Sequence, residues 1–265
     1  MSFRPERGPH RAREIAESFG SDAARYDRAR PRYPDAMVAR ILAGSPGRDV
    51  LDVGCGTGIV ARQFQAAGCR VLGIDVDERM VAFARLTGLE VELANFEAWH
   101  RAGRSFDAVV CGQAWHWVDP VAGAAKAAEA LRPDGRLAVF WNVAQPAPEL
   151  AEALSGAYRR ALPGSPFASG VLPGLDGYAA YLADAADGMR QTGAFADPEQ
   201  WSFAWDHEYT REQWLERVPT FSGHSQFPRP TLERLMACIA AAIDALGGSF
   251  NMPYTTAVVT ARRTR

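Results

Sequence analysis

The sequence predicts an α/β fold in which a buried parallel strand leads through a glycine-rich turn into a helix. The first observation is the apolar run Asp49–Val53, which carries an acid at Asp52. Glycines follow it at alternate positions: Gly54, Gly56 and Gly58. Apolar residues then recur at the spacing of a helix that ends near Gly68. A second apolar run, Arg70–Asp75, again ends in an acid. This order of elements is typical of the first half of a nucleotide-binding sheet.

The spacing of the glycines separates this loop from the dinucleotide fingerprint G-x-G-x-x-G. Gly58 stands two positions after Gly56, and the next position holds Ile59, so the fingerprint is not met. Asp75 lies 23 positions beyond Asp52, close to the ~20-residue spacing at which an acid meets ribose hydroxyls. A carboxylate suits two neighbouring hydroxyls because it accepts two hydrogen bonds at once. A nicotinamide-dependent oxidoreductase is therefore a disfavoured alternative.

The glycine loop, the preceding Asp52 and the spaced Asp75 together resemble the first motifs of class I S-adenosylmethionine (AdoMet) methyltransferases. The resemblance implies a doubly wound, seven-stranded, mostly parallel α/β sheet with an antiparallel last strand and a helical cap. The turn and strand over 132–141 resemble the entry to the fifth strand of that family. The resemblance also implies AdoMet as cofactor, S-adenosylhomocysteine (AdoHcy) as product, and no metal. Since AdoMet carries no phosphate, the loop has to admit a methionine tail and a ribose.

An N-terminal segment resembles a cap that folds over the methionine end of AdoMet. The string from Ala24 to Pro34 is similar to that of small-molecule enzymes related to trans-aconitate methyltransferase. By this resemblance Tyr26 covers the methionine end and Arg30 meets its carboxylate. The alternative interpretation is a packed amphipathic helix with its arginines in water.

The residues after the second and third strands are candidates for the adenine end of the cofactor. Val76 offers an apolar face, and Met80 lies one helical turn further on. After the strand predicted over 89–93, Asn95 stands where the family usually has an acid. Its amide oxygen can still accept a hydrogen bond from the adenine amino group. Phe96 would bring its backbone N–H to the adenine ring and its own ring to the wall of the site.

The fourth predicted strand, Phe106–Cys111, leads into the aromatic string 114–117, which is similar to a His-Trp pair in the same relatives. Ligands bind beyond the carboxyl ends of strands where the strand order reverses. Gln113 matches a position near the methionine end. His116 is the candidate catalytic base because imidazole titrates near neutral pH; the alternative is that it only orders the loop. Alignment of a nucleophile supplies roughly 7–11 kcal/mol, whereas a base adds only ~10²–10⁴-fold, so positioning is expected to dominate.

These inferences define one predicted site and one domain plan. The predicted cofactor residues are Tyr26, Arg30, Asp52, Gly54, Gly56, Gly58, Asp75, Val76, Met80, Asn95, Phe96 and Gln113. Residues 1–13 are expected to be a flexible tail and residues 14–265 the methyltransferase domain. Within it, residues 14–44 form the N-terminal cap helices, and a Pro/Gly-rich insertion over 145–197 caps the substrate cleft. Four residues of that insertion either line the cleft or pack the cap: Phe167, Leu172, Tyr178 and Tyr181.

The composition is that of an ordinary globular protein. The chain has 265 residues, is 48% hydrophobic and carries a net charge of −2, so no strong positive field favours nucleic acid. Four cysteines form no C-x-x-C pair and are expected to be reduced. No apolar run approaches the ~20 residues of a membrane helix, and the N-terminus lacks a signal-peptide pattern. The expected location is the bacterial cytoplasm. His207 and His224 are expected to have surface or packing roles, not metal-binding ones.

The sequence thus predicts transfer of a methyl group from AdoMet to an oxygen, nitrogen or carbon atom of a small-molecule acceptor. A protein that binds or senses AdoMet without turnover is the alternative from another class. The sequence identifies neither the acceptor nor the oligomeric state.

Overall fold

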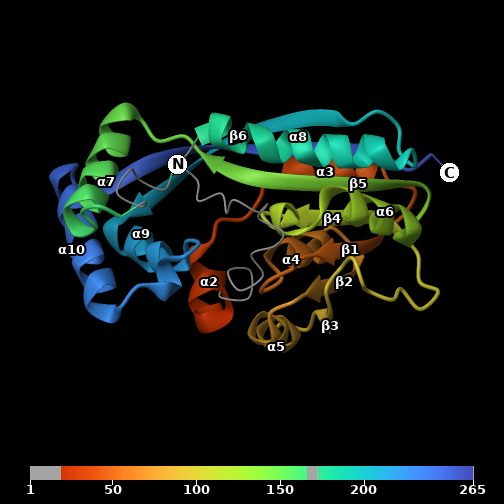
Figure 1. Ribbon diagram of the computed structural model, residues 1–265, viewed down its shortest axis with the longest axis horizontal. Coiled ribbons are helices and arrows are strands. Elements are labelled where there is room, and N and C mark those ends of the chain that lie inside the picture. The colour runs from red at the N-terminus through yellow and green to blue at the C-terminus, as the bar shows by residue number, and fades with distance from the viewer. Residues whose placement is uncertain (1–18, 166–171, 173, 265) are drawn as a thin grey trace.

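The computed structural model describes residues 19–165, 172 and 174–264. At its centre is a sheet with the strand order β3-β2-β1-β4-β5-β7-β6 (Figure 1). The strands are β1 (Asp49–Val53), β2 (Arg70–Asp75), β3 (Glu90–Leu93), β4 (Phe106–Gly112), β5 (Leu131–Ala144), β6 (Glu199–Thr210) and β7 (Ser249–Arg262). Strands β1 to β5 run parallel, and β7 is antiparallel to both β5 and β6. This confirms the predicted doubly wound, seven-stranded, mostly parallel sheet with an antiparallel last strand.

Helices cover both faces of the sheet. On one face, α3 (Asp35–Ala43), α4 (Ile59–Ala66) and α5 (Glu78–Leu86) bury apolar side chains against β1, β2 and β4. On the other face, α6 (Pro120–Ala130) and α8 (Gly174–Thr192) pack against the same strands and β5. The side chains of β1 alternate between the two cores, since Val50 belongs to the first and Leu51 and Val53 to the second. Asp52 therefore points to the face that α3 and α4 cover.

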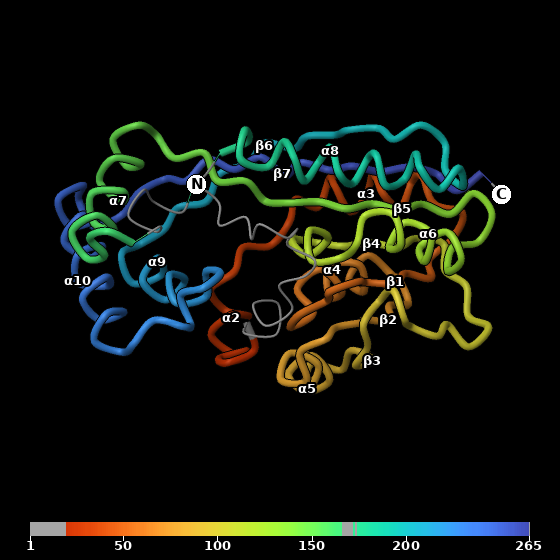
Figure 2. Tube along the Cα trace, in the orientation of Figure 1, coloured from red at the N-terminus to blue at the C-terminus, as the bar shows by residue number. Residues whose placement is uncertain are grey.

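A second group of helices lies at one end of the molecule. It contains α7 (Pro148–Ala161), α9 (Arg211–Arg217) and α10 (Arg229–Ala245), with the short helices η5 (Val218–Thr220) and η6 (His224–Gln226). Figure 1 shows this group on the left, beyond the ends of the short strands β1 to β4. The long strands β5, β6 and β7 reach it and contribute Ala144, Tyr209 and Tyr254 to its core. The tube in Figure 2 shows that α2 (Ala23–Ala29) runs between this group and the sheet.

The insertion predicted over 145–197 divides between these two places. Its first helix, α7, packs against α10 in the helical end, whereas α8 lies along α6 on the sheet. Leu172 packs into the core of the helical end, and Tyr178 and Tyr181 pack against the core under α8. The tail over 1–13 and Phe167 lie outside the described residues.

Local sequence signals fix several helix ends. Thr210 caps α9 by accepting from the backbone N–H of Gln213, whose side-chain oxygen accepts from the backbone N–H of Thr210, so the two residues form a capping box. Asp119 caps α6 in the same way by accepting from two backbone N–H groups. The four cysteines are free. Across the described ranges, we find no helix both long and apolar enough to cross a membrane.

Candidate active site

The glycine loop leaves β1 through backbone conformations that disfavour side chains. Gly54 and Gly56 have φ angles of +66° and +54°, in the left-handed region. A Cβ on Gly54 would lie 2.5 Å from the Cβ of Ala114, so β4 and its following loop pack directly against it. A Cβ on Gly56 would meet nothing within 4 Å. The loop is therefore tight on one side and open on the other, where a ligand can approach the backbone.

Asp75 at the end of β2 holds this loop in place. Its carboxylate accepts hydrogen bonds from the backbone N–H of Gly56 at 2.7 Å and of Asp77 at 2.9 Å. Burial raises the pKa of Asp75, and the two amide bonds oppose that rise. The acid that the spacing singled out thus lies against the middle of the glycine loop.

Asp52 is a fully buried acid with no hydrogen bond in the part of the chain that the structure describes. Burial raises its pKa well above the ordinary range, and the charge of Asp75 adds to the effect. The amide of Ala61 opposes the rise without making a hydrogen bond to the carboxylate. An unpaired buried carboxylate is costly, so Asp52 favours a positive charge near the loop.

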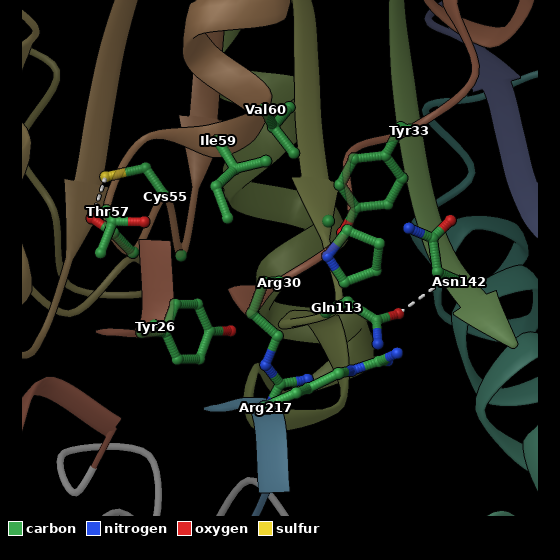
Figure 3. A pocket seen from close by; sticks show the side chains of 14 residues that line it. Tyr26, Arg30, Tyr33, Cys55, Thr57, Ile59, Val60, Gln113, Asn142 and Arg217 are labelled. Carbon is green, nitrogen blue, oxygen red and sulfur yellow. Dashed lines mark hydrogen bonds between the residues drawn. The ribbon is translucent and has the colours of Figure 1, made fainter. Parts of the chain in front are cut away.

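A cavity of about 530 Å³, open to solvent, lies at the carboxyl ends of β1, β4 and β5 (Figure 3). This is where the strand order reverses, because β1 lies between β2 and β4. The lining residues are Tyr26, Arg30, Pro31, Tyr33, Gly54, Cys55, Gly56, Thr57, Ile59, Val60, Gly112, Gln113, Asn142 and Arg217.

Helix α2 forms one wall of this cavity and is fixed at two points. Asp27 pairs with Arg62 of α4 at 2.5 Å, and Arg28 pairs with Glu216 of α9 at 2.9 Å. Arg30 follows the helix, lies over the Tyr26 ring with its guanidinium carbon 4.8 Å from the ring centroid, and donates to the carbonyl of Thr220. The segment therefore brings Tyr26 and Arg30 to the cavity lining, and their contact with the methionine end of AdoMet stays a prediction.

Gln113 and Asn142 form the floor of the cavity. Gln113 has a φ of +59°, and its side-chain oxygen accepts from the backbone N–H of Asn142 at 2.8 Å. The Asn142 side chain donates to the carbonyl of Arg32 and accepts from the hydroxyl of Thr256. These bonds join the ends of β4 and β5 to the N-terminal segment.

The four residues predicted for the adenine end lie outside this lining. Met80 is buried at the start of α5, with Val76 partly exposed before it. Asn95 is exposed, and its side-chain oxygen accepts from the backbone N–H of Ala98 at 3.1 Å, so the amide closes a turn. The ring of Phe96 is buried in the core, with its centroid 6.3 Å from that of Trp115. Their contact with adenine stays a prediction.

His116 lies in an aromatic cluster and is not part of the cavity lining. Its ring stacks on Tyr181 with centroids 4.9 Å apart, and its Nδ1 accepts from the indole N–H of Trp141 at 3.3 Å. Burial lowers the pKa of His116 to about 4. A base with so low a pKa is weak at neutral pH, so this geometry favours the structural alternative over catalysis.

Replacing His116 by Gln tests this interpretation through the pH dependence of stability. Because the folded-state pKa is lowered, stability is full above pH 6.5 and falls as the pH drops toward 4. The variant should lose less stability over that window, by on the order of 1–3 kcal/mol after discounting for partial exposure. Thermal unfolding between pH 4 and 8 measures the difference. A variant whose activity loses its pH dependence, with unchanged stability, would instead assign His116 to the chemistry.

Several lining residues were not predicted from the sequence. The hydroxyl of Thr57 is buried and makes no hydrogen bond within the described structure, although Thr57 stands in the glycine motif. Asn142 was detectable as a polar residue in an apolar strand. Arg217 carries no local signal, because only the fold brings α9 to the cavity. Over the described ranges, no group of three or more His, Cys, Asp and Glu side chains is arranged to hold a metal ion.

Comparison with known proteins agrees with this geometry. A family model described as a methyltransferase domain matches residues 51–139, the stretch from β1 through most of β5. Residues 51–139 of the chain are therefore similar to a methyltransferase domain. The likeness to the trans-aconitate methyltransferase group stays a prediction.

Curated relatives match over about half of their length. An uncharacterized methyltransferase of Mycobacterium tuberculosis is 38% identical over 132 residues, which are 49% of this chain and 54% of the relative. A malonyl-[acyl-carrier protein] O-methyltransferase of Enterobacter lignolyticus is 34% identical over 145 residues, 52% and 57% of the two chains.

Solved structures share the fold over a greater length. A candidate type II methyltransferase from Anaeromyxobacter dehalogenans superposes with a TM-score of 0.60 at 22% identity, covering 88% of this chain and 97% of the other. The [4+2]-cyclase SpnF superposes with a TM-score of 0.50 at 19% identity, covering 89% and 85%. At these identities the superpositions support the fold, not the activity.

Proposed function

We propose that this protein transfers a methyl group from AdoMet to an oxygen, nitrogen or carbon atom of a small-molecule acceptor. The observation that carries the proposal is the cavity beside the glycine loop, where Asp75 fixes Gly56 and leaves open space in front of it. Curated relatives are named methyltransferases, and the names of two of them specify O-methylation.

The donor groups around the cavity fit AdoMet in charge and in hydrogen-bonding capacity. Asp75 would accept from the ribose hydroxyls, and the cavity lining adds the Thr57 hydroxyl, which has no hydrogen-bond partner among the described residues. Arg30 would meet the carboxylate of the methionine tail, since its Nε–H has no hydrogen-bond partner. A carboxylate at Asp52, buried behind the loop, would be stabilised by the positive ammonium and sulfonium groups of a bound AdoMet. Val76, Met80, Asn95 and Phe96 are proposed for the adenine end.

The contribution of this chain to catalysis would be orientation. AdoMet would supply a methyl group already activated by the positive sulfur. Gln113, Tyr26 and Arg30 line the cavity and would limit how the methionine end lies. Holding an acceptor atom in line with the methyl supplies roughly 7–11 kcal/mol. The low pKa of His116 agrees with a mechanism that depends on positioning more than on a base.

Calorimetry with AdoHcy and with NAD tests the cofactor assignment. We expect saturable binding of AdoHcy and no measurable heat with NAD, because the loop lacks the dinucleotide spacing. Tight NAD binding without AdoHcy binding would overturn the proposal in favour of the oxidoreductase alternative.

Binding without turnover is a second candidate function. The superposition on a protein named a cyclase supports this second candidate, because this fold alone does not specify methyl transfer. Incubation with methyl-labelled AdoMet and a wide panel of small acceptors separates the two, since a sensor would bind AdoMet and label none of them.

A further inference from the structure

Arg217 is a buried guanidinium without a counter-ion. Its residue is 5% exposed, and its Cζ lies 5.1–5.5 Å from the ring centroids of Tyr209, Trp214, Phe221 and Tyr254. Its Nη1 donates to the hydroxyl of Tyr209 at 2.6 Å and to that of Tyr254. No carboxylate within the described residues forms an ion pair with it. A buried charge that lacks a partner is destabilising unless a ligand neutralises it.

The free edge of this guanidinium has the shape of a carboxylate site. Nη1 donates to the two tyrosines, whereas Nε is buried and has no hydrogen-bond partner among the described residues. Nη2 has no hydrogen bond to another described residue either. The Nε–H and Nη2–H groups form the parallel fork with which arginine binds both oxygens of a carboxylate. A phosphate has more acceptor oxygens than a carboxylate, and the two N–H groups of one fork cannot donate to all of them.

Arg217 lines the same cavity as the proposed cofactor site. Figure 3 shows Arg217 next to Arg30 and Gln113, away from the glycine-loop residues Cys55 and Thr57. Arg30 comes from the segment that covers the methionine end, so it is the guanidinium available to the carboxylate of AdoMet. Arg217, which enters from α9, is left for a second anion.

We propose that Arg217 binds a carboxylate of the methyl acceptor, so that the acceptor is a small organic acid. This inference rests on the proposed function, because it assigns the space that AdoMet leaves in the cavity. The two tyrosine hydroxyls keep the fork in its orientation, and the surrounding rings keep water from competing for it.

Calorimetry on the full chain saturated with AdoHcy tests the proposal with matched probes. The pairs are benzoate with benzamide and malonate with malonamide, which differ in charge at nearly constant shape. We expect at least one acid to bind and its amide to bind at least about 10-fold more weakly. Arg217→Gln and Arg217→Lys should each weaken that acid by about 10- to 100-fold. Lysine keeps the charge but loses the fork.

The affinity for AdoHcy shows whether Arg217 binds the carboxylate of the cofactor or that of the acceptor. Arg217→Gln should leave it within about 2-fold of the wild type, whereas Arg30→Gln should weaken it by about 10-fold. If Arg217→Gln weakens AdoHcy instead, Arg217 serves the cofactor and the proposal is overturned. If the wild type does not bind AdoHcy at all, the proposed function fails first, which is a separate outcome.

Two controls keep the test interpretable. Arg211→Gln changes an exposed arginine of the same helix, which pairs with Glu212 and Asp244, and should alter neither affinity. Thermal unfolding shows whether a variant is folded. If both Arg217 variants unfold, the comparison of acid with amide on the wild-type protein still tests the proposal. Equal binding of an acid and its amide, or no binding of either acid, overturns it.

Discussion

Replacing Asp75 by Asn should lower the affinity for AdoHcy by about 100-fold. The amide keeps the shape of the carboxylate but loses the charge and one of the two acceptor oxygens, which accept from the backbone N–H groups of Gly56 and Asp77 and would also accept from a bound ribose. A hydrogen bond to a charged group contributes about 1.5–3 kcal/mol, and a 100-fold change corresponds to about 2.7 kcal/mol. Isothermal calorimetry of the wild type and the variant measures it.

The folded state should tolerate this change better than the ligand site does. Because burial raises the pKa of Asp75, the neutral amide removes an unfavourable buried charge. The melting temperature of the ligand-free variant is therefore expected to stay close to that of the wild type. An unchanged AdoHcy affinity would remove Asp75 from the cofactor site, and a large fall in melting temperature would make its role structural.

Replacing Gly54 by Ala should destabilise the protein by about 2–5 kcal/mol. The left-handed backbone costs an alanine about 1–2 kcal/mol, and its Cβ would lie 2.5 Å from the Cβ of Ala114, which the packed core cannot accept without movement. Overpacking of this kind adds about 1–3 kcal/mol. Denaturant unfolding of the ligand-free proteins gives the change in the free energy of unfolding.

Gly68→Ala is the matched control for this substitution. Gly68 has a φ of +85°, but a Cβ there would meet nothing within 4 Å. It should therefore cost only the backbone term of about 1–2 kcal/mol. Equal losses for the two variants would show that β4 does not confine the glycine loop.

The sheet and its glycine loop could be predicted because their signals are local. The alternation of apolar residues, the glycine spacing and the acid at the end of β2 lie within the segment 49–75, and short-range geometry determines what they form. The capping box at Thr210 is local in the same sense. Tyr26, Arg30 and Gln113 came from a resemblance, and the fold brings them to one cavity.

The remaining residues of the site depend on contacts between distant segments. Arg217 reaches the cavity only because β6 and β7 are long enough to carry α9 past the sheet, which no local pattern announces. The insertion over 145–197 has the composition of a lid, but the alanine-rich faces of α6 and α8 pair on the sheet. Asn95 fits an adenine contact in sequence, yet its side chain closes its own turn.

The position of α2 has a consequence for the order of events in a reaction cycle. Asp27 ties this helix to α4 beside the glycine loop, and Arg28 ties it to α9 in the helical end. The helix leads to Arg30 in the cavity lining. A ligand that moves α2 on the cofactor side is therefore expected to change the space on the acceptor side. Thermodynamic linkage makes such an influence mutual, so AdoMet and the acceptor are expected to raise each other's binding affinity. Release of the methylated product is then expected to lower the affinity for AdoHcy.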